Sequence, residues 1–293
     1  MICYSIKRTE IESKVSAIAP TWAKRAQKHT KGLKFPPIWS EIKSVFMEVQ
    51  HDKCAYCERQ IGSKEHGRVE FDVEHFRPKG AVVAWGKVPS YMFPIGASSP
   101  TGYTELAYHL ANYAVACKTC NSGLKNCHFP IEGSRDTAGD DPATLNSSEK
   151  PLLLFPIGDT VDDPRDLIRF QGVIPVVVNQ DASHYDNHRA QVTIDFFDLL
   201  QREDLLRERS RYIISLYFVL LAVQQSFPLS DRALLLFLSD SHPHTNCLNC
   251  FKKIFDTNQP LATQYAIACV EYLESNKAFD ILDYLPMSQY AED

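Results

Sequence analysis

Paired cysteines constrain the fold of this chain more than any other sequence feature. Six of the nine cysteines form three Cys-x-x-Cys pairs, and two of these, Cys54/Cys57 and Cys117/Cys120, lie far apart in the sequence. Two such turns supply four thiolates, which close a tetrahedral zinc site and leave no position open for substrate. The spacing therefore predicts structural Zn²⁺ on four cysteines, whereas free buried thiols would need the same spacing twice by chance.

The third pair, Cys247/Cys250, closely follows His242 and His244. These four residues could form a second zinc site, but two ligands from so short a histidine segment would strain a tetrahedron. We favour cysteines packed at the start of a helix. The remaining cysteines are expected to be plain thiols: Cys3, Cys127 and Cys269.

The charge of the chain is unevenly distributed. The formal net charge is −5, with 31 Lys+Arg against 36 Asp+Glu. Residues 1–53 contain ten Lys/Arg and five Asp/Glu, a net +5, which leaves −10 for the other residues. A basic N-terminal segment can steer nucleic acid, and a solvated lysine-rich helix face explains the same charge equally well.

Two features predict a cytoplasmic protein without a membrane segment. The N-terminal residues lack the basic-then-apolar order of a secretory signal, and a reducing compartment disfavours a disulfide framework. The longest apolar run, residues 212–223, is well short of the roughly 20 residues that span a bilayer. We expect this run to be a buried helix, with partner binding as the alternative.

Hydrophobic periodicity predicts a mixture of helices and strands. Residues 38–49 have apolar residues at helical spacing, and residues 68–75 alternate as a half-buried strand does. Residues 80–104 contain several Gly, Pro and Ser and are expected to be a long loop, and 105–125 lead towards a helix. The patterns further predict a short strand and three helical segments, over 173–178, 187–225, 231–239 and 260–275.

Several residues of catalytic type surround the first two cysteine pairs. Glu74 and His75 end the predicted strand, Asn112 precedes the second pair, and Asn121 follows it directly. Taken singly, Glu74 and His75 could be a polar strand end, and Asn121 could cap a helix. In this order they resemble the HNH endonucleases (ββα-metal, or His-Me finger) of the zinc-stapled subset. The stretches that carry the resemblance are 73–79 and 112–125.

The resemblance implies a role for each residue. His75 would be the general base for the water that attacks the phosphate, since imidazole titrates near neutrality. Glu74 and Asn121 would hold one divalent cation, Mg²⁺ or Mn²⁺, because oxygen ligands suit hard cations. Asn112 would fix the loop that carries His75. The candidate phosphate contacts are Arg77, Lys79 and Lys125.

The resemblance also implies an α+β fold. An N-terminal helical segment and a ββα-metal nuclease core with its four-cysteine zinc site would occupy residues 1–135, and residues 150–293 would be a mainly α-helical region that is a candidate for partner binding. The acidic segment 131–166 would connect them. Glu74 stands where Asp is commoner and Asn121 where His is commoner, which leaves the metal preference open. The gap of 37 positions from His75 to Asn112 implies an insertion.

Over about residues 38–210 the chain resembles a narrower group, the HNH nucleases of Septu-type anti-phage systems. Such nucleases pair with an ABC-type or SMC-like ATPase, and some accompany a retron with its reverse transcriptase and noncoding RNA. The resemblance therefore implies a nucleic acid substrate, DNA before RNA, and an ATPase partner. The stretches are 38–58, 73–79, 102–108, 128–130, 150–154, 163–170 and 189–207.

A different class of function competes with the nuclease. A zinc-stapled module could bind nucleic acid, or adapt a partner, without cleaving anything. The set Glu74, His75 and Asn121 discriminates the two, because a binding module needs no imidazole base beside a hard-metal site. A cleavage assay decides between them.

Overall fold

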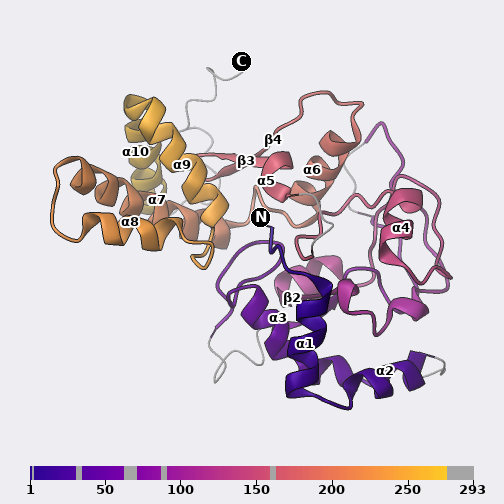
Figure 1. Cartoon of the computed structure of the whole chain (residues 1–293). Coiled ribbons are helices and arrows are strands. Elements are labelled where there is room, and N and C mark those ends of the chain that lie inside the picture. Colours follow the sequence, from indigo (N-terminus) through magenta and orange to yellow (C-terminus); the bar gives the residue numbers. More distant parts are fainter. Residues whose placement is uncertain (2, 31–34, 63–70, 87–90, 159–162, 276–293) are drawn as a thin grey trace.

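The computed structural model describes residues 1, 3–30, 35–62, 71–86, 91–158 and 163–275, and these form a mixed, mostly helical fold with two small β-hairpins (Figure 1). The helices and strands are α1 (Arg8–Ile18), α2 (Trp22–Thr30), η1 (Ile38–Ile42), α3 (Lys43–Val49), β1 (Phe71–His75), η3 (Thr104–Leu106), η4 (Leu110–Asn112), β2 (Tyr113–Cys117), η5 (Thr119–Lys125), α4 (Pro142–Glu149), α5 (Pro164–Leu167), β3 (Ile168–Gln171), β4 (Ile174–Val177), α6 (Tyr185–Phe196), α7 (Glu203–Gln224), α8 (Ser230–Leu238), α9 (Thr245–Thr257) and α10 (Gln259–Ser275).

The first hairpin, β1 with β2, lies at the centre of the N-terminal half. The strands pair antiparallel, with Phe71 opposite Cys117 and His75 opposite Tyr113. The predicted strand is confirmed over 71–75, and 68–70 lie outside the described residues. The π-helical turn η5 follows β2 closely, whereas η3 and η4 lie between the two strands along the chain.

The predicted helix over residues 38–49 is confirmed in position but begins as a 3-10 helix. Backbone N–H groups of Ile38 and Ser40 donate to the carbonyls of Pro36 and Pro37, which gives tight turns before α3 takes over. The amide of buried Gln50, just after α3, bonds to both the N–H (2.7 Å) and the C=O (2.8 Å) of Val115. This side chain thus pairs with the edge of β2 that β1 leaves open.

The acidic segment 131–166 contains more ordered structure than a connector needs. Asp141 caps α4 by accepting from Thr144 N at 2.9 Å, and Pro142 occupies the first turn. Leu145 and Glu149 of this helix are buried. The acidic segment therefore contains a helix that packs on the core, which its net negative charge did not indicate.

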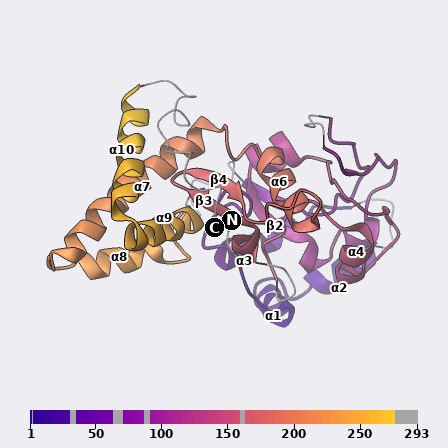
Figure 2. The same ribbon diagram turned by 90° about the horizontal axis from the view of Figure 1, so that it is seen from above.

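Two clusters of buried apolar residues form the interior. The first cluster extends from the N-terminal residues to Leu205 and includes both strands of the first hairpin. The second cluster runs from Phe170 to Tyr272 and consists of β3–β4 and the C-terminal helices. In two perpendicular views, α7 to α10 gather on one side of the molecule and the first hairpin with α1 to α4 on the other (Figures 1 and 2).

The C-terminal half is helical, as predicted, but the predicted segment 187–225 is divided into two helices. Residues 187–225 contain two helices, α6 and α7, and 173–178 overlap β4. The helix α9 begins just before the third cysteine pair, as the favoured interpretation of Cys247 and Cys250 predicted, and it continues to Thr257. None of the helices in the described part of the chain is long and apolar enough to cross a membrane.

Candidate active site and cysteine cluster

Cys54, Cys57, Cys117 and Cys120 converge on one buried point. Their four sulfur atoms lie within 4.8 Å of one another, and the Sγ atoms of Cys57 and Cys117 are 3.8 Å apart. Sulfurs bound at about 2.3 Å to a tetrahedral zinc lie about 3.8 Å from one another. The cluster, formed by the turn after α3 and the turn after β2, is therefore arranged so that it can hold a zinc ion.

The surroundings of the cluster suit thiolate ligands. Cys117 N donates to Cys54 Sγ at 3.4 Å, and Arg202 Nη1 donates to Cys120 Sγ at 3.3 Å. Burial raises the pKa of the Cys54 thiol well above its usual value, and a bound cation would favour the thiolate form of this ligand. Soft sulfur donors in a closed set of four fit Zn²⁺.

The third cysteine pair forms no comparable group. Among the described residues, the only set of three or more metal-ligating side chains with converging ligand atoms is the four-cysteine cluster. His244 Nε2 lies 3.4 Å from Glu208, and Cys247 Sγ donates to the Gly172 carbonyl at 3.2 Å. Cys247 is buried near the start of α9, which agrees with the favoured interpretation and not with a second zinc site.

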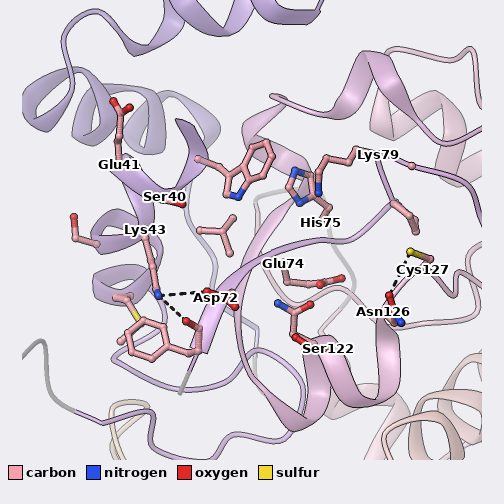
Figure 3. A pocket seen from close by; sticks show the side chains of 18 residues that line it. Ser40, Glu41, Lys43, Asp72, Glu74, His75, Lys79, Ser122, Asn126 and Cys127 are labelled. Carbon is pink, nitrogen blue, oxygen red and sulfur yellow. Dashed lines mark hydrogen bonds and ion pairs between the residues drawn. The ribbon is translucent and has the colours of Figure 1, made fainter. Parts of the chain in front are cut away.

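A pocket of about 890 Å³ opens beside the first hairpin (Figure 3). Four of the predicted site residues line it: Glu74, His75, Lys79 and Asn121. Its walls come from η1 and α3, from β1, from the 78–80 loop, and from η5 with the residues after it. Figure 3 shows Glu74 between His75 and Ser122, so residues of β1 and η5 face the same space.

His75 is held in one orientation and one tautomer. Its Nε2 lies 3.1 Å from the carbonyl oxygen of Ala107, which also accepts the Tyr113 hydroxyl at 2.6 Å. A carbonyl only accepts, so Nε2 carries the proton and Nδ1 keeps its lone pair. Burial, helped by the positive charge of Lys79, lowers the pKa of His75 to about 3. The imidazole is therefore neutral at physiological pH with its lone pair on Nδ1, and it is a weaker base than the imidazole titrating near neutrality that the sequence predicted.

The Glu74 carboxylate is buried against two lysines. Lys125 Nζ lies 2.7 Å from Glu74 Oε1 and donates to the His75 carbonyl at 3.1 Å. The partner of Oε1 is therefore the buried ammonium of Lys125, in an ion pair. Burial raises the pKa of Glu74, and the nearby ammonium groups of Lys125 and Lys79 partly oppose this.

Asn112 braces the chain immediately after His75. Its Oδ1 accepts from Arg77 N at 2.7 Å, and its Nδ2 donates to the carbonyls of Arg77 (3.0 Å) and Leu106 (3.2 Å). Leu106 directly precedes Ala107, whose carbonyl holds the imidazole. One buried amide thus ties together the two segments that position His75.

Arg77, predicted as a phosphate contact, lies elsewhere. Its guanidinium donates to Glu149 Oε2 and to Asn146 Oδ1, both at 2.9 Å, and the residue is only 1% exposed. Arg77 is not among the residues that line the pocket of His75. The prediction for Arg77 is corrected by this placement, because its charge is already matched by a buried carboxylate.

Several residues of the site escaped the sequence motif. The ring of Trp39 meets the His75 imidazole edge-on with centroids 4.8 Å apart, and Lys79 Nζ lies 4.6 Å above the same indole. Tyr113 packs edge-on against the other side of the imidazole, at 5.0 Å. Trp39 lies in the helix that leads to the first cysteine pair and in the stretch 38–58 that carries the narrower resemblance, but neither signal indicated a contact with His75. The Ala107 carbonyl has no side-chain signal at all.

Comparison with protein-family models, curated proteins and solved structures finds no match for this chain.

Proposed function

We propose that this protein is a metal-dependent HNH endonuclease that hydrolyses phosphodiester bonds, with DNA the first candidate substrate and RNA the second. The observation that carries the proposal is the convergence of His75, Glu74 and Asn121 on one pocket, with Asn112 bracing the loop between them. A hairpin followed by a helical turn, fastened beside a four-cysteine cluster, fits the ββα-metal core that this motif order suggests.

In the proposed mechanism His75 is the general base. A water molecule would give its proton to His75 Nδ1 as its oxygen attacks the phosphorus of the scissile phosphate, and the bond from phosphorus to the 3′ oxygen breaks as that oxygen leaves. The Ala107 carbonyl keeps the proton on Nε2, and the flanking rings of Trp39 and Tyr113 prevent the imidazole from turning away. The imidazole therefore needs no reorientation before it accepts the proton.

Glu74 and Asn121 are the residues that would hold a divalent cation. The buried carboxylate of Glu74, which is paired with the Lys125 ammonium, and the amide oxygen of Asn121 are hard donors, which fit Mg²⁺ or Mn²⁺. Such a cation would stabilise negative charge on the phosphate and on the leaving oxygen. Lys79 lies in the pocket wall and would contact a phosphate. Lys125, also predicted as a phosphate contact, is instead fully buried against Glu74 and does not line the pocket, which corrects that prediction.

We further propose that the nuclease acts in the cytoplasm within an anti-phage complex that contains an ABC- or SMC-like ATPase, with a retron as one genetic context. The support is the Septu-like resemblance together with a surface of the C-terminal helices. Large apolar side chains are exposed on and between α7 and α8: Phe218, Phe227, Leu229, Leu235 and Leu236. An exposed apolar patch of this kind is typical of a protein interface.

The decisive experiment is a cleavage assay on plasmid DNA and on RNA with Mg²⁺ or Mn²⁺, with and without the ATPase partner. We expect wild-type protein to cut and His75→Ala to lose at least about 100-fold in rate, as removal of a general base does. The matched control is His184→Asn, because His184 is half exposed and caps α6 away from the pocket. Equal cutting by His75→Ala, or binding without any cutting by wild type, contradicts the proposal and favours the non-catalytic module.

A further inference from the structure

The cation-binding end of the pocket is already rich in positive charge. Glu74 is matched by Lys125 at 2.7 Å, and Lys79 contributes a second ammonium that acts on the same carboxylate. Lys125 is fully buried, so water does not screen its charge as it would at the surface. One carboxylate thus faces two ammonium groups before any divalent cation arrives.

The other acids of the pocket cannot correct this balance. Asp72 pairs with Lys118 and lies 3.8 Å from Lys43, and Glu41 forms a two-pronged ion pair with Arg25 at 2.7 and 2.8 Å. Each carboxylate of the wall already has its own cation. A divalent cation at Glu74 would therefore add two charges to a region that is net positive.

We propose that Lys125 makes cation binding at Glu74 depend on nucleic acid, so that the metal and a substrate phosphate bind cooperatively. The inference rests on the proposed function, because it concerns the cation and the phosphodiester of that same site. In the free protein the Lys125 ammonium serves as the counter-ion of Glu74 and competes with the metal. A phosphodiester in the pocket brings the negative charge that lets ammonium and metal coexist.

The coupling has a consequence for both ligands. If nucleic acid tightens metal binding by some factor, the metal must tighten nucleic acid binding by the same factor. The reason is that the total free energy of binding both ligands does not depend on which of them binds first. The free protein would then carry little catalytic cation, and the site would become complete only on its substrate. A lysine that merely fastens η5 to β1 would produce no such coupling.

The test measures Mn²⁺ binding by calorimetry to full-length, zinc-loaded protein carrying His75→Ala, which prevents cleavage. Titrations are made without and with a short DNA duplex. We expect the duplex to tighten Mn²⁺ binding by about tenfold or more, within the usual range of linked binding. In the same background, Lys125→Gln should tighten Mn²⁺ binding without DNA and reduce the effect of the duplex.

Two further variants keep the result interpretable. Lys125→Arg retains the positive charge and should retain the coupling, even where Lys125→Gln is poorly folded. Lys43→Gln removes a charge from the same pocket beside Asp72 and should leave the coupling intact. Equal Mn²⁺ affinity with and without DNA, while binding is clearly measurable, overturns this inference and leaves the nuclease proposal standing. No Mn²⁺ binding in any sample overturns the proposed cation site itself, and this inference with it.

Discussion

At the scale of single residues, Arg77 and Lys79 show how strongly a site depends on distant partners. They are separated only by Pro78 and look equivalent as candidate phosphate contacts. In the structure Lys79 lines the pocket, whereas Arg77 is paired with Glu149, which is 72 positions away. Local sequence predicted two cations near His75, and it could not show that one of them is needed inside the fold.

Glu149 makes a clear prediction possible at this scale. It is fully buried and accepts from Arg77, from the Tyr103 hydroxyl (2.6 Å) and from Asp136 N (2.9 Å). We expect Arg77→Met to lower the free energy of unfolding by about 3–5 kcal/mol, because it leaves a buried carboxylate without its cation. Urea unfolding followed by circular dichroism measures the loss.

Lys79→Met is the matched control for that experiment, since it removes one charge from the same loop. We expect it to change stability by less than about 1 kcal/mol and to weaken nucleic acid binding, as loss of a half-exposed phosphate contact does. An Arg77→Met protein that is as stable as wild type but binds nucleic acid poorly would restore Arg77 as a phosphate contact.

At the scale of elements, what could be predicted follows from how local each signal is. Apolar and polar residues alternate within the five residues of β1, and apolar residues recur at helical spacing over many turns of α7. Both elements could therefore be predicted from the sequence. The helix α4 was missed although its Asp141-Pro142 start is a recognisable capping signal. The convergence of His75, Glu74 and Asn121 was predicted by motif order alone, while the support from Ala107 depends on a backbone atom.

The contacts of the basic helix α2 place it beside the pocket that contains His75. It has no acidic residue, and Lys24 and Lys28 are exposed on successive turns. Arg25 ties the helix to Glu41 on the pocket wall, and His29 lies 6.0 Å from Tyr108, whose ring is 5.9 Å from Trp39. This part of the basic N-terminal segment therefore adjoins the proposed active site.

We expect the double variant Lys24→Gln/Lys28→Gln to weaken binding of a DNA duplex by about tenfold at low salt. Each lysine that contacts a phosphate also steepens the salt dependence, so the slope of log K against log salt should fall by about 2. Fluorescence anisotropy in the His75→Ala background measures both. Lys252→Gln/Lys253→Gln on α9 is the control, and an equal loss there would show that only net charge matters.

At the scale of the whole molecule, the cysteine cluster lies where the two apolar clusters meet. Tyr56, inside the first cysteine turn, stacks on Phe197 with ring centroids 4.1 Å apart. Arg59, just after that turn, pairs with Asp204 and Glu208 of α7, at 3.0 and 3.3 Å. Arg202, which begins α7, donates to Cys120. The two cysteine turns thus connect the strand β2 to the first turns of α7.

Removal of the metal should therefore loosen both halves of the molecule together. Structural zinc contributes roughly 10 kcal/mol or more to folding in small zinc domains, so Cys54→Ser should lose zinc and unfold cooperatively over the hairpin. Hydrogen exchange should show lost protection in β1, in β2 and in residues 203–208, with α9 and α10 less affected because they belong to the second cluster.

Cys250→Ser, outside the cysteine cluster, should keep both zinc and protection. Full zinc retention by Cys54→Ser would contradict a four-thiolate site, and an unchanged α7 would show that the helix does not depend on the metal.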